Sequence, residues 1–261
     1  MQKLLLGFLF LMCECSLAIV GGRTLTDGSY RQSVALVFKQ NETQPTGEIY
    51  CSGTLIGPRL VLTAAHCLRS GAKAFKVSLE EFQKSTWVYI GDSPNESSKP
   101  LVVPQIRTAR AYIYPQTDAA MSDIAMLELA DDVDLQVFQI QPAPVTLADS
   151  RMMGRDLTHV GFGATEDQGS KGTKASLTLP LRRLNGYNGL GVGEMLTSGP
   201  SACHGDSGGS AYILDEDGII KFIGVEYSIS NHPCGKAATY FIPISTRLLQ
   251  WIKEPKLPIF E

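Results

Sequence analysis

The sequence TAAHC, residues 63–67, places a histidine and a cysteine directly after a short apolar, β-branched run, Leu60–Thr63. Similar runs recur along the chain, and clusters of Gly, Pro, Asn and Asp that are typical of turns separate them. They are Ser33–Phe38, Thr54–Ile56, Trp87–Ile90, Ile124–Leu129, Thr158–Val160, Ile219–Val225 and Tyr240–Ile244. Many short strands between turn signals predict an all-β barrel or sandwich.

Two helical segments are expected beside these strands. Ala64–Leu68 can form one helical turn, which would carry the histidine of TAAHC. Ser245–Lys253 (STRLLQWIK) repeats apolar residues at helical spacing after a Ser or Thr that can cap a helix, so it predicts a C-terminal helix. Glu166–Lys174 (EDQGSKGTK) is polar and contains glycine, which predicts an exposed and mobile loop.

The composition is that of a globular protein. The 261 residues fit one large domain or two small ones. A hydrophobic fraction of 44% and a charged fraction of 19% exclude a disordered tail, a coiled coil and a collagen. The net charge is -3, so nothing in the charge balance attracts nucleic acid or an acidic membrane surface.

Residues 1–18 have the pattern of a secretory signal peptide. Lys3 precedes the apolar run Leu4–Met12, which is too short to cross a bilayer because spanning takes about 20 apolar residues. Ser16-Leu17-Ala18 supplies a small-x-small cleavage site. Cleavage after Ala18 would leave residues 19–261 as a secreted chain, extracellular or, in a bacterium, periplasmic, with no membrane attachment. A buried N-terminal helix is the alternative.

The cysteine count indicates disulfides. Cys13 and Cys15 would leave with the signal, and the four that remain are Cys51, Cys67, Cys203 and Cys234. An even number in an exported chain favours two disulfides, and a zinc site is the weaker reading because no C-x-x-C pair is present. Spacing alone leaves all three pairings open. We expect no metal and no cofactor.

Four short motifs carry residues suited to catalysis: Ile19–Gly22, Thr63–Cys67, Asp123–Leu127 and Gly205–Gly209. A serine hydroxyl is a weak nucleophile until a neighbouring base takes its proton. An imidazole titrates near neutrality, and a carboxylate can fix its tautomer. Each motif alone has an ordinary explanation as a turn or core segment. Together, in this order and behind a signal peptide, they favour a hydrolytic site over a structural β-barrel without one.

Through these motifs the chain resembles the trypsin/chymotrypsin-like serine proteases. The resemblance extends over essentially all of residues 19–261. The resemblance implies two six-stranded antiparallel Greek-key β-barrels packed together, with a C-terminal α-helix. It implies an endopeptidase that forms an acyl-enzyme, with His66 as the base, Asp123 as its partner and Ser207 as the nucleophile. The backbone N–H groups of Gly205 and Ser207 would form the oxyanion hole.

The resemblance also implies how the enzyme is activated and cross-linked. The new amine of Ile19 would pair with Asp206, and signal removal alone would expose it, because Ala18 rather than a basic residue precedes it. The implied disulfides are Cys51–Cys67 and Cys203–Cys234. Protein or peptide substrates and protein inhibitors are the expected partners, and a monomer is the expected state.

Four positions implied by the resemblance set the substrate pocket. Ser201 lies at its base, and Tyr227, Ser228 and Ala238 form its wall. An uncharged residue at the bottom of the pocket argues against Lys or Arg substrates, while Ser228 and Ala238 narrow the pocket opening. We predict cleavage after medium or large apolar residues. An elastase-like preference for small residues is the alternative.

Glu226 departs from the family pattern, which has a serine there that supports the catalytic aspartate. A second carboxylate near Asp123 would repel it and raise a pKa. We expect instead that Glu226 points to solvent after a local register shift; a third option is that it enters the pocket and admits a basic group. This departure alone favours the rival function, an inactive protease-like binding protein. His159, His204 and His232 are expected at the surface or pocket rim.

Overall fold

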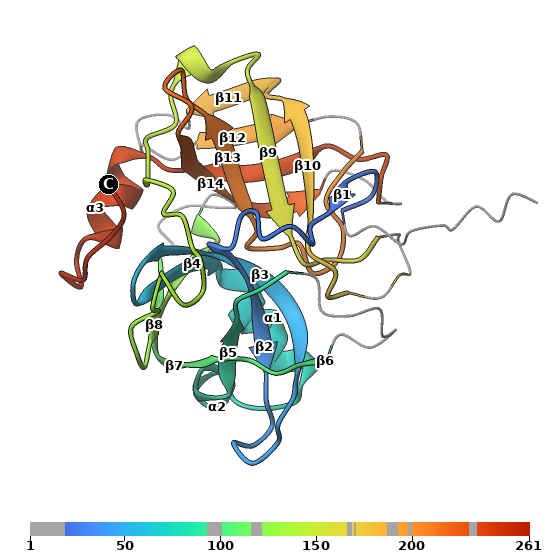
Figure 1. The fold of residues 1–261 in the computed structure, drawn as a ribbon, viewed down its shortest axis with the longest axis vertical. Coiled ribbons are helices and arrows are strands. Elements are labelled where there is room, and N and C mark those ends of the chain that lie inside the picture. The colour runs from blue at the N-terminus through green and yellow to red at the C-terminus, as the bar shows by residue number, and fades with distance from the viewer. Residues whose placement is uncertain are drawn as a thin grey trace, which may run out of the picture.

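A computed structural model describes residues 19–92, 101–115, 122–165, 169, 171–186, 193–197, 200–229 and 234–261. The expected signal peptide, residues 1–18, and His232 lie outside the described residues. Two antiparallel β-sheets form the body of the protein, one above the other in Figure 1, with a helix near the C-terminus beside them. The prediction of two packed antiparallel barrels with a C-terminal helix is confirmed.

The first sheet closes on itself. Its strands are β2 (Ser33–Phe38), β3 (Gly47–Gly57), β4 (Leu60–Ala64), β5 (Thr86–Tyr89), β6 (Leu101–Val102), β7 (Ile106–Ile113) and β8 (Ile124–Leu129). They follow the order β2-β5-β7-β8-β4-β3-β6, and β2 also pairs with β3. That extra pairing closes six strands into a barrel, and β6 extends the edge of β3.

The second sheet also forms a barrel. Its strands are β1 (Arg23–Thr24), β9 (Asp156–Gly161), β10 (Ala175–Pro180), β11 (Arg183–Gly186), β12 (Gly193–Thr197), β13 (Ser210–Leu214), β14 (Ile220–Ile229) and β15 (Thr239–Pro243). Their order is β1-β10-β9-β13-β14-β15-β12-β11. Only Leu181 and Arg182 separate β10 from β11, although the two strands stand far apart in this order. The N-terminal strand β1 lies on the outside of β10.

The three α-helices of the described chain are α1 (Ala65–Ala74), α2 (Leu79–Lys84) and α3 (Thr246–Ile252), with a short 3₁₀ turn at Ser150–Met152. The predicted C-terminal helix is confirmed as α3, and the Ser245 hydroxyl caps it by accepting from the Leu248 N–H. Helix α1 extends well past the single turn that the sequence indicates. Helix α2 was not predicted.

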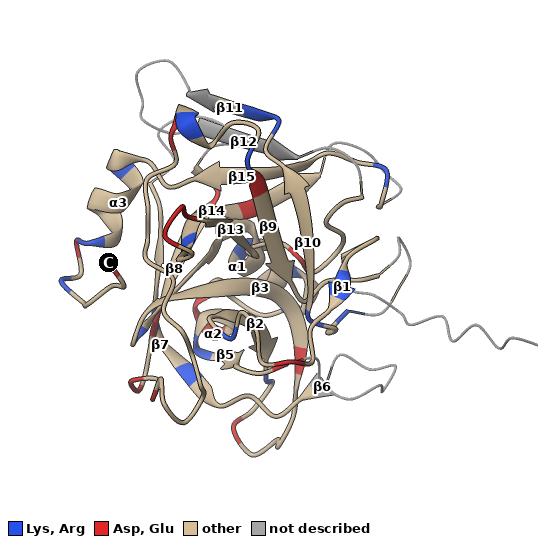
Figure 2. Cartoon of the chain, turned by 45° about the horizontal axis from the view of Figure 1, so that its top comes forward, with Lys and Arg blue, Asp and Glu red and all other residues tan. Residues whose placement is uncertain are grey.

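Polar and apolar contacts join the two barrels. One apolar cluster contains Leu62 and Met126 from the first barrel together with Val225 from the second. The buried hydroxyl of Ser33 lies 2.8 Å from that of Ser210 across the same junction. Lysine, arginine, aspartate and glutamate residues are interspersed over both barrels (Figure 2). The barrel junction is therefore a packed and hydrogen-bonded seam.

Residues 166–168 and 170 of the predicted exposed loop, Glu166–Lys174, lie outside the described residues, and the last residue of the segment is not exposed. Lys174 is fully buried, and its ammonium group donates to the carbonyl oxygens of Ser29 at 3.1 Å and Gly91 at 3.3 Å. Burial lowers the pKa of Lys174 to about 7, since a charged ammonium loses its hydration there. The prediction is wrong at this residue, because the backbone carbonyls of distant loops replace water around the amine.

Candidate active site

His66 and Asp123 are joined by two hydrogen bonds. Strand β4 pairs with β8 so that Ala64 faces Ile124, which brings the start of α1 against the residue before β8. The His66 ring nitrogen Nδ1 lies 2.5 Å from Asp123 Oδ2, and the His66 backbone N–H donates to Oδ1 at 2.6 Å. The carboxylate thereby holds both the ring and the backbone of the histidine. Strand register brings together two motifs that are far apart in the chain.

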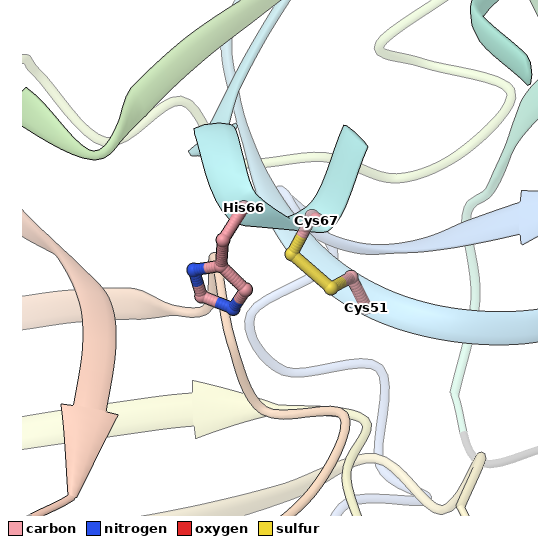
Figure 3. A group of neighbouring side chains, drawn as sticks. All are labelled: Cys51, His66 and Cys67. Carbon is pink, nitrogen blue, oxygen red and sulfur yellow. A yellow bond between two sulfur atoms is a disulfide. The ribbon is translucent and has the colours of Figure 1, made fainter. Parts of the chain in front are cut away.

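A disulfide fastens the turn that carries His66. Cys67, the next residue on α1, is bonded to Cys51 on β3, and Figure 3 shows this bridge beside the imidazole. These three side chains cluster as metal ligands would. Thiolates are the cysteine form that binds metal, however, and both sulfurs here are consumed by the bridge. The second disulfide is Cys203–Cys234, so both implied pairings are confirmed.

The turn that carries Ser207 is held from the opposite barrel by Ser52. The Ser52 hydroxyl donates to the Gly205 carbonyl at 2.9 Å and accepts from the Phe162 N–H at 2.8 Å. The Ser52 N–H donates to the Ser207 carbonyl at 2.9 Å. Gly205 has a φ of 98°, a conformation open to glycine at little cost. Sequence reasoning missed Ser52; its place beside Cys51 was the available signal.

Ser207 is half-buried, and its carbonyl oxygen lies 3.4 Å from the sulfur of Cys67, the residue after His66. Among the described residues, no hydrogen bond joins the Ser207 hydroxyl to His66. The catalytic roles of His66, Asp123 and Ser207, and the oxyanion hole at Gly205 and Ser207, therefore stay predictions.

Asp206 is fully buried beside the nucleophile. Its carboxylate accepts from the backbone N–H groups of Gly163 and Cys203, each at 2.8 Å. Burial raises its pKa to about 7, and these two hydrogen bonds oppose the rise. A Cβ on Gly163 would lie 2.5 Å from Asp206 Cγ, so only glycine admits the carboxylate there. Ile19 is buried against Ala175, and its salt bridge to Asp206 stays a prediction.

The expected pocket residues lie along β14, β15 and the second disulfide. Ser201 is fully buried; its hydroxyl accepts from the Gly235 N–H at 2.9 Å and donates to the Ala202 carbonyl at 3.0 Å. Tyr227, Ser228 and Ala238 are each partly exposed, as wall residues of an open pocket would be. Their contact with a substrate stays a prediction.

Glu226 does not point to solvent, so that prediction is wrong. A bulge in β14 does shift the register against β15 after this residue, yet its side chain is only 2% exposed. Burial, then the charges of Asp206 and Asp123, raise the pKa of Glu226 well above its ordinary value, and the Ser207 hydroxyl opposes the rise. The alternative in which a second carboxylate faces Asp123 matches this arrangement.

His159 is buried rather than at the surface or pocket rim, which corrects the prediction for this residue. Neither ring nitrogen has a hydrogen-bond partner among the described residues, and the ring packs edge-on against Phe241 with centroids 5.2 Å apart. Burial lowers the pKa of His159 to about 3, so the ring is neutral. His204 is exposed, as expected.

Two antiparallel barrels with a His–Asp pair and a Gly-Asp-Ser-Gly turn at their junction define the chymotrypsin-like class of proteins. The family model for trypsin matches residues 19–252. The chain therefore belongs to the trypsin family and is a serine endopeptidase. No helix in the described part of the chain is long and apolar enough to cross a membrane.

Curated relatives agree with this family. Phenoloxidase-activating factor 3 of Holotrichia diomphalia is 28% identical over 92% of this chain and 74% of its own length. CLIP domain-containing serine protease B14 of Anopheles gambiae is 26% identical over 84% of this chain and 66% of its length. Phenoloxidase-activating enzyme 1 of Spodoptera litura is 27% identical over 92% of this chain and 68% of its length.

Proposed function

We propose that this endopeptidase is secreted and that His66, Asp123 and Ser207 form its catalytic triad. The observation that carries the proposal is that the Asp123 carboxylate contacts His66 twice. It lies 2.5 Å from the ring nitrogen Nδ1 and accepts from the backbone N–H at 2.6 Å. An aspartate that accepts from Nδ1–H leaves the other ring nitrogen, Nε2, as the free base. The Ser207 turn lies on the facing barrel, fixed there by Ser52.

The reaction follows from these positions. His66 Nε2 takes the Ser207 proton while Oγ bonds to the substrate carbonyl carbon, and the imidazolium then gives that proton to the leaving amine. Water repeats the sequence on the acyl-enzyme. The N–H groups of Gly205 and Ser207 stabilise the oxyanion, and one such donor contributes on the order of 3 kcal/mol in related chemistry.

The proposed specificity is for medium or large apolar residues. The Ser201 hydroxyl is neutral, and its bonds to Gly235 and Ala202 occupy it, so the pocket base offers no charge to a Lys or Arg side chain. Ser228 and Ala238 would narrow the pocket mouth. A preference for small residues is the second possibility, and the peptide test below separates the two.

Secretion and partners complete the proposal. Two disulfides suit an oxidising compartment, which agrees with cleavage of residues 1–18 and export. Family membership indicates protein or peptide substrates. Two relatives are named for activating phenoloxidase, which favours a protein as the natural substrate. Protein inhibitors are further proposed partners, and the proposed state is a monomer.

Active-site labelling tests the proposal. The secreted chain should start at Ile19 by N-terminal sequencing and should react with a fluorophosphonate probe at Ser207, while Ser207→Ala should not react. Chromogenic peptides with Leu, Met, Phe or Tyr before the scissile bond should be cleaved fastest. Fast cleavage after Arg or Lys would overturn the specificity. No adduct in correctly processed protein would favour the inactive binding protein.

A further inference from the structure

Glu226 is tied through its backbone to the two glycines that follow Ser207. Its N–H donates to the Gly209 carbonyl at 2.9 Å, and its carbonyl accepts from the Gly208 N–H at 2.8 Å. On the other side it pairs with Phe241 of β15. These bonds fix the backbone of Glu226 against the nucleophile turn, and its side chain is buried there.

The carboxyl of Glu226 lies among polar groups, and no cation of the described chain pairs with it. The groups that act on it are Asp206 from the nucleophile turn, Asp123 from the residue before β8, and the Ser207 hydroxyl. From β9, the His159 ring packs against Phe241, the β15 residue that pairs with Glu226. Its Oε2 is buried without a hydrogen-bond partner, and no lysine or arginine of the described chain forms a salt bridge with it.

An ionised carboxylate in this position is unfavourable. Removing a charged group from water costs several kcal/mol unless a cation or enough hydrogen bonds replace the water. Two neighbouring aspartates add repulsion, and together with burial they raise the pKa of Glu226. The neutral carboxylic acid is therefore the favoured form over a wide pH range. In that form Glu226 gains an O–H donor that a carboxylate lacks.

We infer that Glu226 is a positioning residue that sets the direction of the Ser207 proton, an inference that rests on the proposed triad. In the protonated state, Glu226 donates its O–H to Ser207 Oγ, which leaves the serine proton for His66. In the ionised state, Glu226 accepts the serine O–H and withholds that proton from His66. When Oγ attacks, the serine proton passes to His66 Nε2 and the proton on Glu226 stays in place.

The consequence is a protease whose serine loses reactivity as Glu226 ionises. Above that transition the reactive fraction of Ser207 falls about tenfold per pH unit, as for any single essential acid. A glutamine at this position keeps an N–H donor and the side-chain shape but does not titrate. Glu226→Gln therefore isolates the proton from the packing.

The test compares fluorophosphonate labelling rates and kcat/KM across pH for the wild type, Glu226→Gln and Glu216→Gln. Glu216 is an exposed carboxylate in the β13–β14 turn and serves as the control. We expect the alkaline fall in both rates to move up by at least one pH unit in Glu226→Gln and not at all in Glu216→Gln. Any fall caused by the Ile19 amine would remain in all three. Superimposable profiles for the wild type and Glu226→Gln would overturn the inference.

A second measurement does not depend on the folding of Glu226→Gln. Carbon-13 NMR of labelled glutamates should show one carboxyl that titrates far above the others, and Ser207→Ala should move it higher because the opposing hydroxyl is gone. No elevated glutamate, or no shift in Ser207→Ala, would contradict the contact. Failure of the proposed function looks different: no labelling of Ser207 at any pH in the wild type or in Glu226→Gln.

Discussion

The Ser52 hydroxyl on β3 donates to the Gly205 carbonyl on the facing barrel at 2.9 Å, although the two residues are 153 positions apart. The same oxygen accepts from Phe162. One small side chain thus anchors the nucleophile turn of the second barrel to the wall of the first, and the geometry of the proposed oxyanion hole depends on it.

Ser52→Ala should therefore lower both stability and activity. The substitution leaves a buried carbonyl and a buried N–H without partners, and unsatisfied groups of this kind cost about 1–3 kcal/mol each. Urea unfolding should show this loss, and kcat should fall while the exposed control Ser150→Ala leaves both unchanged. Wild-type values for Ser52→Ala would show that the turn is held by other contacts.

Asp123→Asn should nearly abolish turnover with little change in fold. An amide can no longer fix the His66 tautomer or stabilise the imidazolium, and such a substitution in a serine protease triad lowers kcat about 10⁴-fold. Steady-state kinetics and a thermal melt measure the two effects. The exposed Asp131→Asn is the matched control. A loss of only a few fold would argue against the triad.

Asp206 should make stability depend on pH in a chain that retains Ala18. Its folded pKa is about 7 against an ordinary value of 3.8, so the unfolded state releases its proton first as pH rises. Its contribution to stability is present at pH below the ordinary value and is lost between there and about 7, at up to about 1.4 kcal/mol per pH unit. Urea titrations across that range measure it.

The same experiment on a chain that begins at Ile19 tests activation. A free amine beside Asp206 would favour the carboxylate and lower its pKa, which removes this part of the slope. Asp206→Asn should remove it in both chains. Equal slopes in the chains with and without Ala18 would count against the salt bridge.

Lys174 should give the opposite dependence at alkaline pH. Its pKa falls from 10.5 to about 7 on folding, so above 7 the unfolded state binds more protons and stability rises with pH up to about 10.5. Lys174→Met should flatten this rise, while the exposed Lys73→Met should keep it. Denaturant midpoints between pH 7 and 10.5 provide the measurement, and a rise that persists in Lys174→Met would refute the assignment.

Segments that are buried on both faces were predictable from sequence. Every residue of Ser33–Phe38 is buried, and the predicted bounds of this strand and of Ile124–Leu129 match β2 and β8. Strand β7, Ile106–Ile113, was missed because exposed arginines interrupt its apolar residues. Helix α2 was missed because it is one short segment whose only buried residue is Phe82.

The sequence by itself determined the chemistry available: a histidine, an aspartate and a serine in three motifs, each placed at the end or start of a strand by local apolar patterns. Only the tertiary structure decided which of the remaining polar side chains join them. Glu226 turns inward because its backbone pairs with Gly208 and Gly209, and Ser52 reaches Gly205 because the two barrels pack face to face. Such contacts depend on the register between distant strands, and a pattern of neighbouring residues carries no information about that register.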